Sequence, residues 1–135
     1  MPPSDIQRFV LGVGVSADAR PEDAVALAEA AMTRSGLRRQ AIDAIATITS
    51  RRDHPAILAL ASHLGCGIRA FDAASLEAQT PRLKNPSDAL FARIGCHGVA
   101  EAAALAAAGE AAVLIVEKMA GRRVTVGIAG ISAIV

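Results

Sequence analysis

Aromatic residues are almost missing from this chain of 135 residues, which has no Trp, no Tyr and only three Phe. Proteins that hold single-stranded nucleic acids stack the bases on aromatic side chains, so this scarcity argues against such binding. The formal net charge is +1, so no strong field attracts the chain to DNA or to an anionic membrane. We therefore expect neither a nucleic acid nor a membrane as a partner.

Long apolar runs and a cysteine framework are also missing. Although 53% of the residues are hydrophobic, no apolar run approaches the roughly 18 residues of a membrane span. The N-terminus has no cationic head followed by an apolar core, which a secretory signal would need. Cys66 and Cys96 are too few for a disulfide scaffold. The sequence predicts a cytoplasmic protein with one domain over residues 1–135, in which residues 1–7 form a flexible lead-in.

What the chain does contain is a nearly continuous apolar run, RFVLGVGVS, at residues 8–16. Such a run is typical of a strand that is covered on both faces. A loop of small residues follows, and Pro21 is a good first residue for the next helix. In alternating strand and helix folds the ligand usually binds where a strand passes into its helix. We therefore expect the functional end of the domain at this loop.

The remaining patterns predict alternating strands and helices, followed by further helices and a C-terminal hairpin with its turn at 120–122. We expect strands at 8–16, 42–50, 67–71, 112–116 and 123–129, and helices at 21–35, 55–64, 72–77, 88–94 and 99–108. Asp72 and Ser87 are expected to cap their helices, and residues 80–86 to form a loop. The order predicts a three-layer α/β/α fold with a mixed sheet of about five strands.

The motifs that carry chemistry are short, and each has a plainer explanation. Gly12-Val13-Gly14 lacks the third glycine of a dinucleotide fingerprint. The motif indicates either a nucleotide site or glycines that let the chain turn, or another segment approach closely, beside the sheet. Ser87 is a nucleophile or only a helix cap. The scattered cations are a solvated surface, or those in loops meet an anionic ligand. They are Arg51, Arg52, Arg69, Arg82, Lys84, Arg93, Lys118, Arg122 and Arg123.

Metal ligation has only weak support in the residue spacing. The candidate ligands are His54, His63, His97, Cys66 and Cys96. No CxxC, HxxxH or HxH spacing joins them, and a lone cysteine is more often a small buried hydrophobe. We expect no metal site and no cofactor.

An ordered set of short segments resembles the CobE proteins of cobalamin biosynthesis and the C-terminal domain of the related CbiG proteins. The segments are Gly12-Val13-Gly14, Ile45-Ala46-Thr47-Ile48, Asn85-Pro86-Ser87, Val99-Ala100-Glu101-Ala102-Ala103, Lys118 and Val124-Thr125-Val126. The chain departs from the family pattern at Val15-Ser16, where Cys-Arg is common. Arg51-Arg52-Asp53-His54 stands in place of Lys and Asp-Glu, and Gly98 in place of Ser.

The resemblance implies work on the contracting corrin ring, because CbiG-type proteins open a δ-lactone on a cobalt-precorrin and release acetaldehyde. Such substrates carry many carboxylates, which call for cations, backbone N–H donors and small residues at the pocket. The substrate-binding candidates are Gly12, Gly14, Ser16, Thr47, Arg51, Arg52, Asn85 and Ser87. For lactone opening, Glu101 would be the base and Lys118 its electrostatic partner. Alternatively, Glu101 is exposed in the first turn of its helix, and Asn85 only shapes a turn.

Several functions stay open at this point. The chain is an enzyme acting on a precorrin lactone, or a carrier that binds a tetrapyrrole intermediate and passes it to another pathway enzyme. A third hypothesis is a structural partner, whose Ala-rich helix at 99–108 packs on another chain. Association with other pathway enzymes or into homo-oligomers stays open as well.

Overall fold

The computed structural model describes residues 7–132, with side chains for 8–130, so most of the expected lead-in lies outside the described residues. Only Gln7 falls within them, and it begins the first strand rather than a flexible lead-in. The strands are β1 (Gln7–Val15), β2 (Ile42–Ile48), β3 (Gly67–Phe71), β4 (Val113–Ala120) and β5 (Val124–Ser132). The helices are α1 (Pro21–Ser35), α2 (Pro55–Leu64), α3 (Ala73–Glu77), α4 (Asp88–Ile94) and α5 (Ala100–Ala108).

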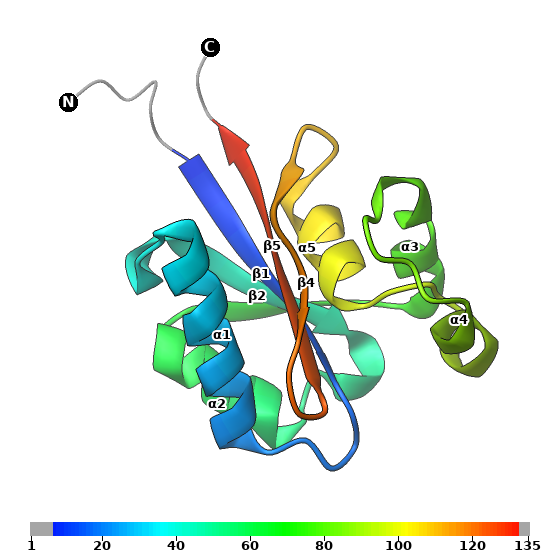
Figure 1. The fold of residues 1–135 in the computed structure, drawn as a ribbon, viewed down its shortest axis with the longest axis horizontal. Helices are drawn as coiled ribbons and strands as arrows, with labels where there is room; N and C mark the ends of the chain where they lie inside the picture. The colour runs from blue at the N-terminus through cyan, green and yellow to red at the C-terminus, as the bar shows by residue number, and fades with distance from the viewer. Residues whose placement is uncertain (1–6, 133–135) are drawn as a thin grey trace.

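The five strands form one mixed sheet in the order β3-β2-β1-β5-β4. β1, β2 and β3 pair in parallel, whereas β5 is antiparallel to both β1 and β4. Figure 1 shows α1 and α2 on one side of this sheet, and α5, with α3 and α4 beyond it, on the other. The predicted α/β fold with a mixed sheet and a C-terminal hairpin is confirmed.

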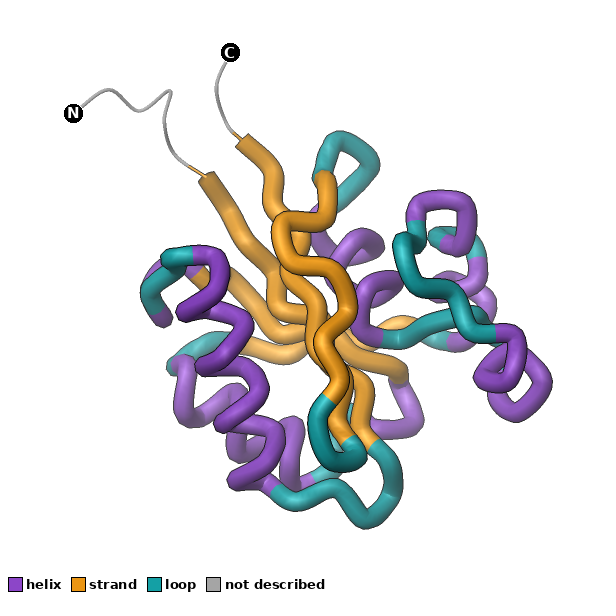
Figure 2. The backbone as a smooth tube through the Cα atoms, in the orientation of Figure 1, coloured by secondary structure: helices purple, strands orange, loops and turns teal. Residues whose placement is uncertain are grey.

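Both faces of the sheet are buried, as the apolar run in β1 predicted. Phe9, Leu11 and Val13 pack toward the core beneath α1 and α2. Val10 points the opposite way, into the core beneath α5. Figure 2 shows the sheet running between these two groups of helices. The alternation follows from the period of two in a strand, and it explains why almost no position of β1 is polar.

Gly12 lies under α5, where a side chain has no room. A Cβ at Gly12 would lie 1.8 Å from the carbonyl oxygen of Ala100, the first residue of α5. β1 pairs without interruption through Gly12 and Gly14 up to Val15. The hypothesis that these glycines turn the chain is therefore wrong. The other alternative, close approach of another segment, is confirmed at Gly12, because the α5 backbone lies against the strand there.

The Ala-rich helix α5 is covered by its own chain. Its residues from Ala100 to Leu105 are all buried, including Glu101, and they pack against β1 and β5 of the same sheet. The hypothesis that this helix packs on another chain is therefore wrong. The small alanine side chains let α5 lie close to the strands, so the alanine run serves the packing of this helix against its own sheet.

Several helix ends agree with the predictions from the sequence. α1 and α2 begin at prolines and end before Gly36 and Gly65, both with positive φ. Asp72 Oδ1 accepts a hydrogen bond from the Ser75 amide (2.8 Å), and Ser87 Oγ accepts one from the Leu90 amide (3.1 Å). Both predicted caps are confirmed, since these side chains satisfy N–H groups that lack a helical partner.

Other boundaries differ from the prediction. β2 ends at Ile48, and Thr49–Arg51 form a 3-10 turn. A further 3-10 turn, Thr80–Arg82, lies in the expected loop. β4 continues to Ala120, so the hairpin turn is shifted by one residue toward the C-terminus. The reason is Arg123, which has a φ of 61° and therefore lies in the turn rather than in β5.

None of the helices between residues 7 and 132 has the length and apolar character needed to cross a bilayer.

Candidate functional site

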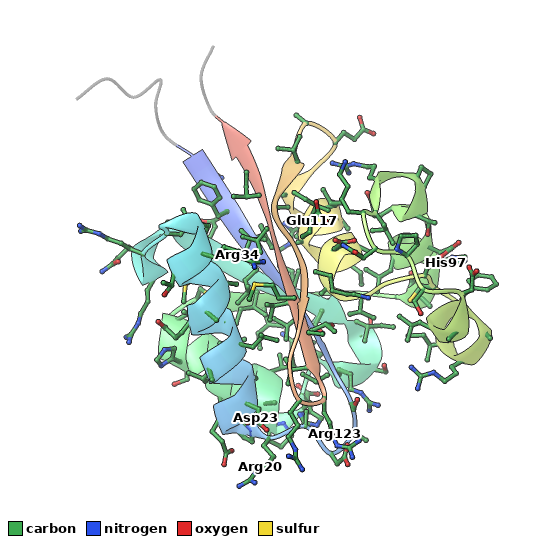
Figure 3. All side chains as sticks on the ribbon, in the orientation of Figure 1. Arg20, Asp23, Arg34, His97, Glu117 and Arg123 are labelled. Carbon is green, nitrogen blue, oxygen red and sulfur yellow. The ribbon has the colours of Figure 1, made fainter. Side chains whose placement is uncertain are left out.

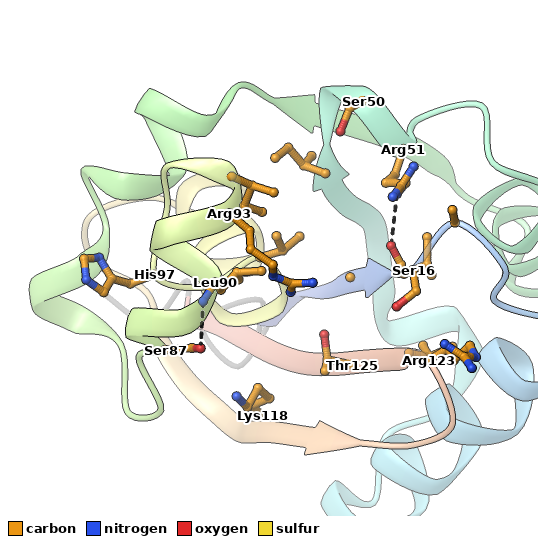
Figure 4. A pocket seen from close by; sticks show the side chains of 18 of the residues that line it. Ser16, Ser50, Arg51, Ser87, Leu90, Arg93, His97, Lys118, Arg123 and Thr125 are labelled. Atoms are coloured by element: carbon orange, nitrogen blue, oxygen red, sulfur yellow. Dashed lines mark hydrogen bonds between the residues drawn. The ribbon is translucent and has the colours of Figure 1, made fainter.

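A cleft of about 470 Å³ lies at the end of the sheet where β1 and β2 finish. It is bounded by the loop after β1, the 3-10 turn after β2, the β4–β5 hairpin and α4 (Figure 4). Its polar and charged lining residues are Ser16, Ser50, Arg51, Ser87, Arg93, His97, Lys118, Arg123 and Thr125. Its larger apolar lining residues are Val15, Ile48, Leu90, Ile94, Val99 and Val124. The carboxyl ends of parallel strands are the usual ligand end of such a sheet.

Positive charge dominates the cleft. Its lining contains the side chains of Arg51, Arg93, Lys118 and Arg123 and, within the described part of the chain, no Asp or Glu. Arg123 Nε lies 3.2 Å from Asp18 Oδ2 at the exposed rim. No carboxylate among residues 8–130 forms an ion pair with Arg93 or Lys118. Neighbouring cations without acidic partners repel one another, so an anionic ligand would stabilise this arrangement.

Figure 4 shows how these side chains are distributed around the cleft. Arg51, Ser16 and Arg123 lie toward one end, and Ser87, His97 and Lys118 lie toward the other. Arg93 extends from α4 into the space between them. The cations therefore come from separate elements and surround the cleft, which suits a ligand with several anionic groups better than one with a single charge.

The loop after β1 is fixed by bonds to three neighbouring segments. Arg51 Nε donates to the carbonyl oxygen of Val15 (3.1 Å), and the Ser16 amide donates to the Arg123 carbonyl (3.0 Å). His54 Nδ1 accepts from the Ala56 amide (3.0 Å), which leaves the ring proton on Nε2, 2.8 Å from the Ala17 carbonyl. This geometry holds the loop at one end of the cleft before any ligand binds.

Glu101 is the second residue of α5 and joins this helix to two other segments. Its Oε1 accepts from the amides of Lys84 and Asn85 (3.0 Å each). Its Oε2 accepts from Asn85 Nδ2 and from the Lys118 amide (2.9 Å each). The side chain is 2% exposed, so the alternative that Glu101 is exposed in its first turn is wrong.

The hydrogen bonds to Glu101 also determine its ionisation. Burial by itself would raise the pKa of this carboxyl. The amides of Lys118, Asn85 and Lys84 and the Asn85 side chain oppose that effect, and the net result is a lowered pKa. A carboxylate that accepts several N–H bonds is stabilised in its charged form. Glu101 is therefore ionised at neutral pH, with both oxygens engaged in hydrogen bonds.

The amide of Lys118 is free to reach Glu101 because β4 is irregular at this point. Val116 pairs with Ile128 and Met119 with Val126, so β4 has one residue more than β5 between these pairs. An extra residue in one strand is a β-bulge, which leaves an amide unpaired in the sheet. Glu101 satisfies this amide, and the bulge carries the Lys118 side chain to the cleft.

His97 lies between two carboxylates at the base of α4. Its Nδ1 is 2.9 Å from Glu77 Oε1, and its Nε2 is 3.3 Å from Asp88 Oδ1. The hydrogen bond from His97 is the main reason that the pKa of Glu77 is lowered. The Phe91 ring stacks on His97 at a centroid distance of 4.5 Å. Figure 3 shows His97 at the α4 side of the molecule, away from Arg123 at the hairpin.

The residues expected to bind substrate divide into two groups. Gly14, Ser16, Arg51 and Ser87 line the cleft, and so does Lys118, one of the two expected catalytic residues. Gly12, Thr47, Arg52, Asn85 and Glu101 do not line it.

Each residue outside the cleft has another place in the structure. The Thr47 hydroxyl is fully buried and donates to the Val13 carbonyl (2.7 Å). Exposed Arg52 lies 3.4 Å from Asp53, and Asn85 is bonded to Glu101. The contacts of Thr47 and Asn85 join segments far apart in the chain, and the spacing of residues in the sequence does not reveal them.

Other residues that line the cleft were not among the candidates. Arg93 and Arg123 were counted only as scattered cations, and Ser50 and Thr125 were not considered. Ser50 adjoins Arg51, which was a candidate, so extending that loop by one residue would have included it. No signal in the sequence singles out Arg93, because only the tertiary structure brings α4 to the cleft.

Within residues 8–130, no three His, Cys, Asp or Glu side chains are grouped in a way that could hold a metal ion. Cys66 and Cys96 are free thiols, and burial is the main reason that the pKa of each is raised. A raised pKa leaves a cysteine as an unreactive thiol.

Comparison with known sequences identifies relatives of this chain. The family described as Cobalamin synthesis G C-terminus matches residues 9–129. Protein CobE of Sinorhizobium sp is 45% identical over 122 residues, which cover 90% of this chain and 79% of that protein.

Solved structures show the same fold. The crystal structure of CobE, a protein from the cobalamin (vitamin B12) biosynthetic pathway, is 32% identical with a TM-score of 0.87, covering 97% of this chain and 95% of that chain. Cobalamin biosynthesis protein chiG from Agrobacterium tumefaciens str. C58 is 29% identical with a TM-score of 0.67, covering 90% of this chain and 96% of that chain. A cobalamin biosynthesis protein G homolog from Sulfolobus solfataricus is 26% identical with a TM-score of 0.72, covering 91% of this chain and 36% of that chain.

The sequence match spans nearly the whole sheet, from β1 to β5, and the CobE crystal structure superposes over almost the entire chain. The chain therefore belongs to the CobE/CbiG C-terminal family of cobalamin biosynthesis proteins.

Proposed function

We propose that this chain binds a precorrin or corrinoid intermediate in the cationic cleft and hands it to another enzyme of the pathway. The observation that carries the proposal is the set of four cations, Arg51, Arg93, Lys118 and Arg123, in a cleft without an acidic lining residue among those described. Intermediates of this class are macrocycles with carboxylates around the rim. Cations that approach from separate elements match such a distribution of charge.

The apolar part of the lining supports the same ligand class. Ile48, Leu90 and Val124 lie among the cations, and a flat ring offers large apolar faces that such side chains can cover. Small-molecule sites combine an apolar lining with a few polar groups that fix orientation. In this cleft the charged residues would select the carboxylates, and the apolar residues would contact the ring.

Lys118 and Glu101 have different parts in this proposal. Lys118 contacts a ligand carboxylate through its ammonium group. Glu101 acts as a positioning residue, because its carboxylate holds the β4 bulge and the loop at 84–85 in place. Ser87 lies two residues after Asn85. The two segments that Glu101 holds therefore carry, or lead to, the cleft residues Lys118 and Ser87.

The alternative is a hydrolase that opens a precorrin δ-lactone, with Glu101 as the base and Lys118 stabilising the alkoxide. That mechanism needs an available proton acceptor beside the bound lactone. The Glu101 carboxylate already accepts four hydrogen bonds, and each ring nitrogen of His97 faces a carboxylate. These contacts favour binding and transfer over hydrolysis.

A titration with uroporphyrin, a flat tetrapyrrole with carboxylates around its rim, tests the binding proposal. Absorption changes should report saturable binding to the wild-type protein. Arg123→Gln should weaken binding about tenfold, because one charge-assisted contact is worth roughly 1.4 kcal/mol. The neighbouring Arg122 is exposed and does not line the cleft. Arg122→Gln should therefore bind as the wild type does, and equal weakening by both changes would contradict the proposed site.

Mass measurement separates the carrier from the hydrolase. Purified precorrin and cobalt-precorrin lactones, in molar excess over the protein, are incubated with it and then extracted, and their masses are measured by mass spectrometry. A carrier returns each compound unchanged, whereas lactone hydrolysis adds the mass of water with multiple turnovers. Turnover that disappears in both Glu101→Gln and Lys118→Ala would establish the hydrolase and reject the carrier.

A further inference from the structure

Helix α4 is the one described helix longer than a single turn that buries none of its residues. A seven-residue helix is marginal by itself and normally gains its stability from packing an apolar face. In α4 the apolar residues stay partly exposed, with Phe91 45% and Ile94 39% exposed and Leu90 half-buried. Figure 1 shows α4 at the edge of the molecule, beyond α3 and α5.

The residues on either side of α4, in contrast, are firmly held. The Ser87 amide donates to the His97 carbonyl (2.7 Å), so the two ends of the segment meet. Cys96 is fully buried, and the His97 amide donates to Glu77 Oε1 (3.0 Å). Gly95, with a φ of 82°, ends the helix between these anchors. A weakly packed helix between two fixed ends can move as a unit about those ends.

The side of α4 that faces the cleft carries Leu90, Arg93 and Ile94. Their spacing places them on one stripe of the helix. Arg93 has no acidic partner among the described residues, and it extends toward the middle of the cleft in Figure 4. The stripe therefore carries one cation and two apolar side chains, and the rest of the cleft lining likewise combines cations with apolar residues.

From these observations we infer that α4 is a cover that closes on the bound ligand, with Arg93 pairing with a carboxylate and Leu90 and Ile94 packing on the ring face. The inference rests on the proposed function and assigns a ligand-binding role to Arg93. It explains why Ile94, which lines the cleft, stays exposed in the free protein, because its partner is the ligand. The free energy of this packing is gained only when the cleft is occupied.

Hydrogen exchange of the full chain, with and without uroporphyrin, tests the inference. In the free protein the amides of residues 88–95 should exchange faster than those of α5, since no side chain of α4 is buried. Saturation with uroporphyrin should slow their exchange at least tenfold. Arg93→Gln should bind about tenfold more weakly and should lose most of this protection. Its control is Arg34→Gln, an exposed arginine in the last turn of α1 that does not line the cleft, which should change neither quantity.

The outcomes separate the inference from the proposed function. If the wild-type protein binds uroporphyrin while residues 88–95 exchange as fast as before, the cover is rejected and the binding function stands. The same holds if Arg93→Gln binds as tightly as the wild type. Failure of the wild-type protein to bind uroporphyrin would reject both. Far-UV circular dichroism of each variant confirms that it is folded, as expected for changes at exposed arginines.

Discussion

At the scale of single residues, Glu101 shows how one buried charge can organise a site without entering it. The carboxylate holds a helix, a loop and a strand bulge together through four N–H donors. Removing a buried acceptor leaves its donors buried without a partner. The free-energy penalty for such unsatisfied donors is larger than the net contribution of a typical hydrogen bond to stability. In the proposed function, Glu101 would therefore affect ligand binding through Lys118 and Ser87.

Glu101→Gln should lower the free energy of unfolding by about 2–3 kcal/mol at pH 7, because an amide nitrogen replaces one accepting oxygen. The folded-state pKa of Glu101 is lowered. Its contribution is therefore complete above the ordinary value of about 4.3 and is lost as the pH falls through the lower folded value. Urea unfolding from pH 7 to about pH 3 should show the variant and the wild type converging in acid.

The matched control for Glu101→Gln is Glu110→Gln, because Glu110 is exposed and its side chain forms no ion pair in the described structure. Its change should alter the free energy of unfolding by less than about 0.5 kcal/mol. Equal effects of the two substitutions would show that the hydrogen bonds to Glu101 do not stabilise the fold.

At the scale of elements, the contact of α5 with β1 places Glu101 where it binds the Lys118 amide of the β4 bulge. Gly12 brings the α5 backbone onto the strand, and α5 carries Glu101 toward β4. A change at Gly12 should therefore affect the whole fold rather than ligand contact alone. For this reason we place Gly12 in the framework of the domain, although its sequence motif suggested a binding role.

Gly12→Ala should destabilise the protein by about 3 kcal/mol, since the new methyl group would collide with the Ala100 carbonyl. Gly67→Ala in β3 is the control, because a Cβ there meets nothing within 4 Å and no strained φ is involved. It should be neutral or stabilising by up to about 1 kcal/mol. Thermal unfolding followed by circular dichroism measures both, and a mild effect of Gly12→Ala would mean that α5 can shift without cost.

At the scale of the whole molecule, charge is balanced overall but uneven in space. The chain has 14 basic and 13 acidic residues, yet the cleft lining described above contains cations without an acid. Attraction of an anionic ligand is therefore local, and it acts over distances comparable with the screening length of the solution.

Raising the salt concentration from about 0.05 M to about 0.5 M should weaken uroporphyrin binding at least tenfold, because screening shortens the range of the cationic field. The loss should be smaller in the double variant Lys118→Ala, Arg123→Gln, which has fewer charges to screen. Arg122→Gln should follow the wild type. Titrations across the salt series measure how the uroporphyrin affinity changes with salt concentration. An affinity that does not change with salt would show that the carboxylates of the ligand do not contribute to binding.

The local pattern of the sequence was enough to predict the strands, the helices and their caps. Pro21, Gly36, Asp72 and Ser87 act through neighbours within a few residues, so their effects can be read without knowing the fold. The alternation of strands and helices then limited the topology to a mixed sheet with a C-terminal hairpin. Resemblance of short segments identified the family, which the comparisons confirmed.

Only the tertiary structure decided what the candidate residues do. Thr47 and Glu101 looked available in the sequence, but both are buried, and Gly12 lies against a helix that begins 88 residues later. Arg93 and Arg123 line the same cleft because the fold places α4 and the hairpin turn beside it. Local pattern carries no information on such long-range contacts, because burial and hydrogen-bond partners depend on how the elements pack.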